Sequence, residues 1–200
     1  MFPPLPPLTR TLIIVNVAAF LLEFLLPGLI QWFALWPLGP YFHPWQVITY
    51  AFLHEPNQLM HIVFNMFAVY MFGGALEMYW RERGAANFYV LYYFASVLAA
   101  AGTELLVLSQ SRGGEPVIGA SGGVFGLLLG FAWFFPRSKL LVLPIPVPIS
   151  AWLLVTIYGA IELWLGVTGR QDSVAHFAHL GGMLGGWLMI EYRKRGGGRR

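Results

Sequence analysis

The sequence predicts an all-α membrane protein with six transmembrane helices, on the evidence of its composition and of its basic residues. Of its 200 residues, 58% are hydrophobic and only 10% are charged, whereas a soluble globular protein is usually about 25% charged. The chain has no cysteine, which excludes disulfides, thiolate metal sites and a cysteine nucleophile. No internal repeat or soluble domain is evident, so residues 1–200 are expected to form one membrane domain.

Six apolar segments are separated by short polar or Pro/Gly-rich stretches. A helix needs roughly 20 apolar residues to cross a bilayer core of about 30 Å. The first segment is followed by Pro27 and Gly28 rather than by a cleavage site of small residues, so it is predicted to be a span and not a removable signal peptide. The expected spans are residues 10–29, 58–78, 86–108, 117–135, 147–166 and 174–191.

The basic residues gather on one side of this arrangement. With six spans, ten of the twelve Lys and Arg residues share a side, and only Arg112 and Arg170 fall on the other. Because basic residues stay cytoplasmic, both termini are predicted to be inside the cell. The ten residues are Arg10, Arg81, Arg83, Arg137, Lys139, Arg193, Lys194, Arg195, Arg199 and Arg200.

Residues 30–57 form an unusual connection that contains no Lys or Arg. Its prolines argue against a continuous span, and its tryptophans and Tyr41 favour the bilayer interface. We therefore expect a structured loop that lies partly in the outer leaflet. At the other end of the chain, the basic residues 194–200 fit either contact with anionic lipid headgroups or a plain topology signal.

Polar groups inside a span are costly and are functional candidates by default. Ser121 follows Gly119, a poor helix residue, so a regular helix is expected to begin near Ser121 and to measure about 22 Å up to Phe135. One end of so short a helix must lie within the membrane. Ser121 would then sit at a helix N-terminus, which favours negative charge. A serine beside Gly122, Gly126 and Gly130 also fits simple helix packing.

His179 points along a glycine face of the last span. At about 100° per residue, it lies about 20° from Gly186 and about 60° from Gly182, and such a face can approach another helix closely. A close approach would let the imidazole act as a general base for a serine. His176 lies off this face, so packing or a supporting hydrogen bond is its expected role.

Other polar side chains in the spans have less definite roles. His61 and Asn65 share a face of the second span, where they fit either an oxyanion hole or an interhelical hydrogen bond. Glu23, Glu104 and Glu162 are expected to be structural.

Together these residues closely resemble the rhomboid family of intramembrane serine proteases. The similar motifs are His61-x-x-x-Asn65, Gly119-Ala-Ser121-Gly122 and Ala178-His179-Leu-Gly-Gly182-x-x-x-Gly186, in the family's order and on the matching spans. Segments 43–54 and 73–77 are also similar. Each motif is weak alone, but three in order are highly specific.

The resemblance implies a six-helix bundle with a membrane-embedded first loop, which the segment at 30–57 would form. Ser121 would be the nucleophile and His179 its base, without an aspartate to complete a triad. His61, Asn65 and the backbone N–H of Ser121 would hold the oxyanion, and Gly119 would shape the loop beside it. Phe125 stands where an aromatic ring packs on the catalytic histidine. Gln46 replaces the arginine of many members, which puts a loop-anchoring contact in doubt.

The activity implied is hydrolysis of peptide bonds in or near transmembrane helices, through an acyl-enzyme intermediate. A helix hides its carbonyls in hydrogen bonds, so the substrate must be locally extended, and it is expected to enter from lipid past the fifth span and residues 167–173. The expected partners are membrane-protein substrates and the bilayer, with no nucleic acid, metal or other cofactor. The expected location is the cell (inner) membrane of a bacterium, with the active site open to the extracytoplasmic side.

Two alternatives belong to other classes. A rhomboid-like protein without activity would bind membrane proteins, but such members lack the serine or the histidine that this chain has. A transporter or metal channel would use His61, His176 and His179, since imidazoles bind zinc. Transporters often show an internal repeat, and none is evident here.

Overall fold

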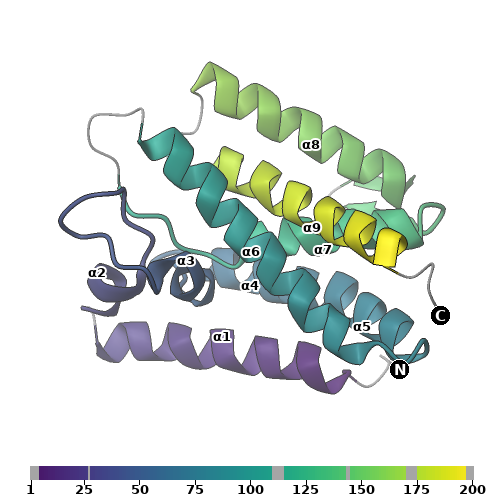
Figure 1. The fold of residues 1–200 in the computed structure, drawn as a ribbon, viewed down its shortest axis with the longest axis horizontal. Coiled ribbons are helices and arrows are strands. Elements are labelled where there is room, and N and C mark those ends of the chain that lie inside the picture. Colours follow the sequence, from purple (N-terminus) through teal and green to yellow (C-terminus); the bar gives the residue numbers. More distant parts are fainter. Residues whose placement is uncertain (1–4, 27, 110–114, 143–144, 170–174, 197–200) are drawn as a thin grey trace.

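The computed structural model describes residues 5–26, 28–109, 115–142, 145–169 and 175–196, and most of them lie in a bundle of helices (Figure 1). After the first helix comes a long continuous helix made of three segments, here called the second rod, whose middle turn is π-helical. The helices of the bundle are α1 (Pro7–Leu25), the rod of α4 (Leu59–Ala68), η2 (Val69–Gly73) and α5 (Gly74–Arg81), then α6 (Ala86–Leu108), α7 (Ser121–Phe134), α8 (Ala151–Thr168) and α9 (His176–Gly196).

The helix boundaries confirm the all-α class. Where the second and third spans were expected, at 58–78 and 86–108, the structure has helices at 59–81 and 86–108. Among the described residues, four helices are long and apolar enough to cross a membrane: α1, the α4–α5 rod, α6 and α8. Helix α7 is apolar but has only 14 residues, as its predicted start at Ser121 requires. The count of six crossings stays a prediction.

The centre of the bundle is the contact of α9 with α6 and α7. Its glycines make this contact close. A Cβ on Gly182 of α9 would collide with the backbone carbonyl of Gly122 in α7, and a Cβ on Gly126 would lie 3.0 Å from the carbonyl oxygen of Gly182. The two backbones therefore touch, as the glycine face predicted.

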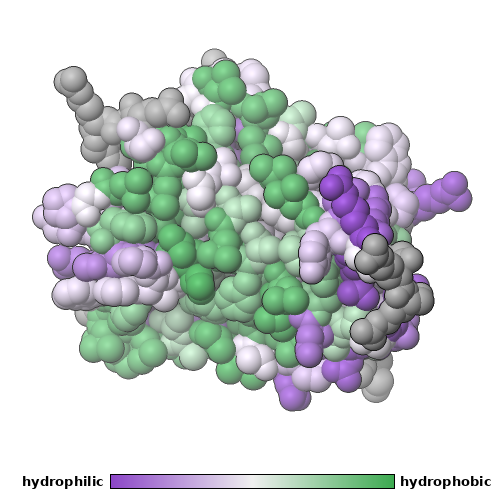
Figure 2. Space-filling view, viewed as in Figure 1, coloured by the Kyte–Doolittle hydropathy of each residue, from purple (hydrophilic) through white to green (hydrophobic). Residues whose placement is uncertain are grey.

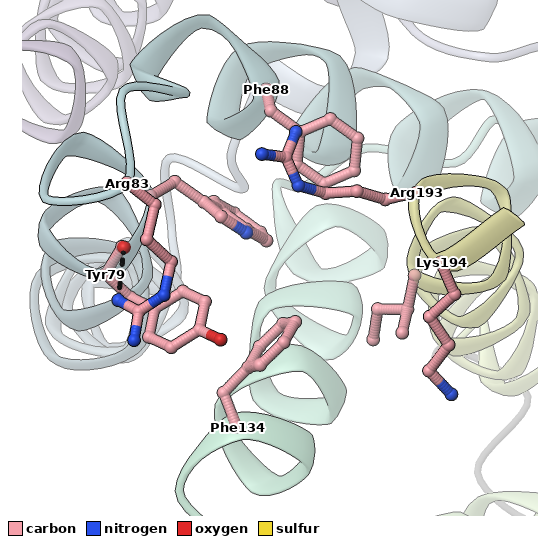
Figure 3. A pocket seen from close by; sticks show the side chains of 8 residues that line it. Tyr79, Arg83, Phe88, Phe134, Arg193 and Lys194 are labelled. Carbon is pink, nitrogen blue, oxygen red and sulfur yellow. Dashed lines mark hydrogen bonds between the residues drawn. The ribbon is translucent and has the colours of Figure 1, made fainter. Parts of the chain in front are cut away.

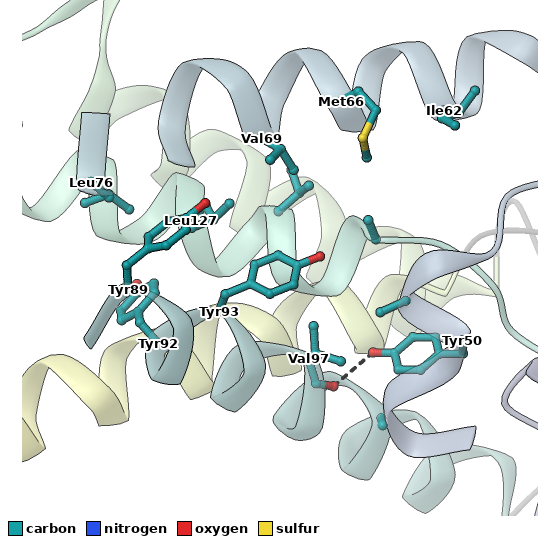
Figure 4. Packing of buried hydrophobic residues seen from close by; sticks show 14 of the residues in the cluster. Tyr50, Ile62, Met66, Val69, Leu76, Tyr89, Tyr92, Tyr93, Val97 and Leu127 are labelled. Atoms are coloured by element: carbon teal, nitrogen blue, oxygen red, sulfur yellow. Dashed lines mark hydrogen bonds between the residues drawn. The ribbon is translucent and has the colours of Figure 1, made fainter. Parts of the chain in front are cut away.

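Aromatic side chains of α6 fill the space between the inner helices (Figure 4). Tyr89, Tyr92 and Tyr93 are fully buried beside Leu76 and Leu127. The hydroxyl of Tyr92 donates to the carbonyl of Gly126 over 2.8 Å. Burying a tyrosine is tolerable when its hydroxyl finds such a partner, and here the partner also ties α6 to the glycine interface.

Helix α8 lies at the edge of the bundle (Figure 1). Only 17% of its most apolar stretch is buried inside the protein, against 39% for both α6 and the α4–α5 rod. Its lipid-facing side chains include Trp152, Leu163 and Val167, which are all exposed. The helix is therefore the least enclosed of the four long apolar helices and is held by comparatively few side chains.

A β-hairpin that the sequence did not predict joins α7 to α8. Strands β1 (Lys139–Val142) and β2 (Ile145–Ser150) pair antiparallel, with Lys139 opposite Ser150. The proline run was expected only to delay the next span. A two-stranded ribbon accepts prolines at alternate positions because every second N–H points away from the partner strand.

The loop at 30–57 is structured, as predicted, by α2 (Leu29–Phe33), α3 (Gln46–Thr49) and the short η1 (Tyr50–Phe52). The doubt about Gln46 was wrong. Its carboxamide is fully buried and bonds four backbone groups across the loop. It accepts hydrogen bonds from the backbone N–H groups of Trp36 and His43 and donates to the carbonyls of Trp32 and Tyr41. A neutral carboxamide can therefore anchor the loop.

The face seen in Figure 2 carries a broad apolar band, and the most hydrophilic residues on it gather at the end where Figure 1 marks both termini. At that end Arg83 follows α5, while Arg193 and Lys194 lie in the last turn of α9, and the three line one aromatic pocket (Figure 3). The guanidinium of Arg83 lies 3.7 Å from the ring centre of Tyr79, and that of Arg193 lies 4.6 Å from that of Phe88. The loop after α5 and the last turn of α9 thus lie at the same end of the bundle. This agrees with the prediction that the two segments share one side of the membrane. Arg112, Arg170 and residues 197–200 lie outside the described residues.

Candidate active site

Ser121 is the first residue of α7. The chain reaches it through an extended segment, in which Val117 and Leu35 exchange two backbone hydrogen bonds of 2.9 Å. Gly119 then takes a φ of +128°, and its N–H donates to the carbonyl of Tyr50. A Cβ at Gly119 would lie 2.9 Å from Nε2 of His61, so both the backbone conformation and the space require glycine. The serine consequently sits half-buried at a helix N-terminus.

The structure brings Ser121 and His179 together. The hydroxyl oxygen of Ser121 lies 2.8 Å from Nε2 of His179, which is 8% exposed. The ring of Phe125 stacks on the imidazole, with centroids 4.2 Å apart and planes 7° from parallel. The glycine contact between α7 and α9 sets this distance, because Gly122 and Gly182 lie within one turn of Ser121 and His179, respectively. Gly186, two turns along α9, extends the same contact against Tyr92 and Gly126.

The other ring nitrogen of His179 faces a carboxylate. Nδ1 lies 3.0 Å from Oε2 of Glu162 on α8, and Nδ1 of His176 lies 2.6 Å from the same oxygen. The first contact is at hydrogen-bonding distance, but its direction falls short of a well-aligned hydrogen bond. Glu162 was expected to be structural. Its polarity inside a span was the available signal, but sequence spacing does not fix which way α8 faces.

The expected oxyanion residues are only partly assembled around Ser121. His61 lies beside Gly119, and a Cβ on Gly119 would be 3.7 Å from the serine oxygen. Asn65, one turn along α4, is buried, and its side-chain N–H group donates to the carbonyl of His61 over 2.9 Å. This bond engages one of the two amide hydrogens of Asn65.

Behind His61 stands a buried histidine that the sequence left without a role. The ring of His54 lies 5.1 Å from that of His61. Burial, aided by the nearby imidazole of His61, lowers the pKa of His54 to about 4, so this loop histidine is neutral at pH 7. Its backbone N–H donates to both carboxylate oxygens of Glu23.

Three of the four buried glutamates, Glu23, Glu104 and Glu162, occupy separate environments. Glu23 holds the loop at His54, which lies away from the contacts of Glu162. Glu104 on α6 is also buried, and its Oε2 has no partner among the described residues. Only Glu162 lies at hydrogen-bonding distance from His179.

The metal-channel alternative named His61, His176 and His179 as ligands, but the structure groups a different set of side chains. Glu162, His176 and His179 offer ligand atoms within 4.8 Å of one another, and His61 is not part of this group. Two contacts of 2.6 and 3.0 Å already join the carboxylate to the two imidazoles. The shorter of these, between Nδ1 of His176 and Oε2 of Glu162, is a hydrogen bond.

Comparison with known proteins assigns the chain to a family. A family model described as the rhomboid domain matches residues 41–195, which include every candidate site residue. The chain belongs to the rhomboid family. It is 35% identical over 146 residues to rhomboid protein 1, mitochondrial, of Saccharomyces cerevisiae, a match that covers 71% of this chain and 40% of that relative.

Bacterial relatives match over more of the chain. Rhomboid protease GlpG of Klebsiella pneumoniae is 29% identical over 192 residues, covering 92% of this chain and 62% of its own length. Rhomboid protease GlpG of Yersinia pestis is 27% identical, covering 96% and 65%. The chain thus spans less than two thirds of the length of these relatives. Family membership and the apolar helices identify a multi-pass membrane protein of the rhomboid type.

Proposed function

We propose that this rhomboid is a serine endopeptidase that cuts membrane proteins in or near their transmembrane helices. The observation that carries the proposal is the 2.8 Å contact between the Ser121 hydroxyl and Nε2 of His179 at the N-terminus of α7. A nucleophile and a base within hydrogen-bond reach are the signature of covalent acyl transfer. The two relatives named as rhomboid proteases support the same class of reaction.

The reaction proceeds in two halves. Nε2 of His179 takes the hydroxyl proton as Ser121 attacks the substrate carbonyl, and the tetrahedral intermediate expels the amine, which receives that proton from His179. Water then attacks the acyl-enzyme and gives a proton to Nε2 of His179. That nitrogen passes the proton to the oxygen of Ser121 as the ester bond breaks and the acid leaves. The N-terminal N–H groups of α7, His61 and the second amide hydrogen of Asn65 stabilise the negative oxygen.

Access to Ser121 sets the substrate class. A membrane helix must unwind locally before its carbonyls can be attacked, so weak helix ends with small residues are the preferred sites. In this proposal the substrate enters laterally past α8, the loosely enclosed helix that carries Glu162. Residues 170–173, which were also expected to lie on the entry path, are outside the described residues. In this proposal the basic end is cytoplasmic, as basic residues require, and Ser121 opens toward the opposite side of the cell membrane.

The test is cleavage of a labelled single-span substrate by the purified protein in liposomes, beside Ser121→Ala and His179→Ala. The wild type should cut while both variants lose at least a thousandfold in rate, as expected for a nucleophile and its base. A fluorophosphonate should label the wild type and not Ser121→Ala. A wild type that neither cuts several substrates nor takes the label would end the protease proposal.

The alternatives predict other results in the same preparation. A non-catalytic rhomboid would bind a substrate helix without cutting it and would resist the fluorophosphonate. A metal channel would melt at a higher temperature with zinc and lose that shift with a chelator, because a ligand that binds only the folded state stabilises it. In this proposal a chelator leaves cleavage unchanged.

A further inference from the structure

Glu162 stands where the third member of a serine triad would stand. Its Oε2 lies 3.0 Å from Nδ1 of His179, while Nε2 of the same ring faces Ser121 at 2.8 Å. The three side chains thus form a chain of contacts that runs from α7 through α9 to α8. Glu162 is 7% exposed, and His179 is 8% exposed.

We propose that Glu162 is a positioning residue that completes a Ser121–His179–Glu162 triad. The inference rests on the proposed function and adds a residue to the pair of side chains that carries it. Its carboxylate holds the proton of His179 on Nδ1, which leaves Nε2 free to accept the hydroxyl proton of Ser121. It also stabilises the imidazolium that forms when that proton arrives, and it takes no proton itself.

The tautomer argument depends on which nitrogens act as donors. A serine hydroxyl that is to lose its proton must donate to Nε2, so the ring hydrogen must be on Nδ1. An ionised carboxylate only accepts hydrogen bonds, and at 3.0 Å it favours that arrangement. Phe125 fixes the plane of the ring by stacking, but stacking is indifferent to the tautomer. The carboxylate supplies what the ring contact lacks.

The surroundings of Glu162 keep its oxygen in place. Nδ1 of His176 lies 2.6 Å from the same Oε2, and the two histidines are one turn apart on α9. One oxygen therefore faces two imidazole nitrogens from a single helix. The contact with His179 is not fully aligned in this structure, and catalytic hydrogen bonds often align only when the substrate is bound.

The experiment compares Glu162→Gln with a matched change, Glu104→Gln, which removes another buried carboxylate beside α9. Each purified variant is first measured for its melting temperature, and all rates are expressed per folded protein. The rates are that of labelling by a fluorophosphonate, which tests the activation of Ser121 without a protein substrate, and kcat and KM for the labelled single-span substrate.

For Glu162→Gln we expect the labelling rate and kcat to fall at least tenfold, while KM changes less than twofold. The carboxamide can donate to Nδ1 and so stabilise the wrong tautomer. For Glu104→Gln we expect a changed melting temperature and labelling within twofold of the wild type. Glu162→Asp, which keeps the charge but withdraws it by one methylene, should give an intermediate rate and serves if the Gln variant does not fold.

Two results would overturn the assignment while leaving the protease intact. In one, Glu162→Gln and Glu162→Asp label as fast as the wild type. In the other, they slow labelling no more than Glu104→Gln does, which would make the effect a general loss of packing. A wild type that neither labels nor cuts would instead overturn the proposed function itself, and the triad with it.

Discussion

The inner helix α9 and the outer helix α8 both carry a member of the proposed triad, but they are held in opposite ways. Helix α9 meets α7 backbone to backbone through Gly182 and Gly122, where a single added methyl group has no space. Helix α8 is mostly exposed to lipid, and a methyl group added at its Gly159 would find only the sulfur of Met183, at 3.7 Å. The fixed interface positions His179, whereas the loose one positions Glu162.

In the proposed protease, this difference separates two requirements of catalysis in lipid. The distance between nucleophile and base must be set to within a fraction of an ångström, and close-packed glycines provide that because interiors of this kind do not deform continuously. A substrate helix must also reach the serine, which requires some element to yield. Glu162 on α8 would therefore contact His179 only while α8 is packed against α9.

The largest effect is expected from placing a methyl group in the fixed interface. Gly182→Ala should destabilise the protein by about 3 kcal/mol, because the new Cβ meets a backbone carbonyl that cannot rotate away. Cleavage should fall more than tenfold as Ser121 and His179 separate. Gly159→Ala is the matched control, and it should raise stability by up to about 1 kcal/mol, since alanine favours a helix. Thermal melting in detergent checks both; equal shifts would erase the distinction between the two helices.

A smaller difference is expected in local opening. Amide hydrogens of residues 155–165 in α8 should exchange at least tenfold faster than those of residues 179–189 in α9, when both are measured in detergent micelles. Few buried contacts lower the free energy of local opening. Glu162→Gln should widen the difference, because it weakens the side-chain link between the helices. Similar protection in both helices would mean that α8 is as fixed as α9.

The sequence predicted the inner region better than the outer one, for physical reasons. Helix α9 carries its contact face as glycines at helical spacing, so the spacing alone directs the side chain of His179 toward a close helix contact. Helix α7 likewise shows its short length and the glycine before Ser121. In both helices the information lies in the repeat of small residues along one element.

Features that depend on two distant segments were missed. Nothing in the spacing of α8 fixes its rotation, so Glu162 was expected to be only structural, and the hairpin of residues 139–150 was not predicted. The four partners of Gln46 are backbone groups, which no residue pattern reveals. Glu77 belongs to the same class: its carboxylate accepts from the N–H of Leu8 and from Thr9 at the start of α1, some 70 residues away.

The smallest effects are expected at two aromatic side chains, Phe125 on α7 and Tyr158 on α8. Phe125 stacks on His179, and Tyr158 meets the edge of Phe125 with centroids 6.3 Å apart. Phe125→Leu should lower kcat about fivefold, because an aromatic pair contributes about 1 kcal/mol beyond its buried area. Tyr158→Leu should lower kcat less than twofold, since it reaches the imidazole only through another ring.

The measurement is kcat for the labelled single-span substrate, with the fluorophosphonate labelling rate as a second reading of His179 alone. If Tyr158→Leu slowed labelling as much as Phe125→Leu, the seating of α8 would govern the base as strongly as the fixed interface does. The imidazole would then belong to the outer region of the molecule as much as to the inner one, and Glu162 would be expected to carry most of that dependence.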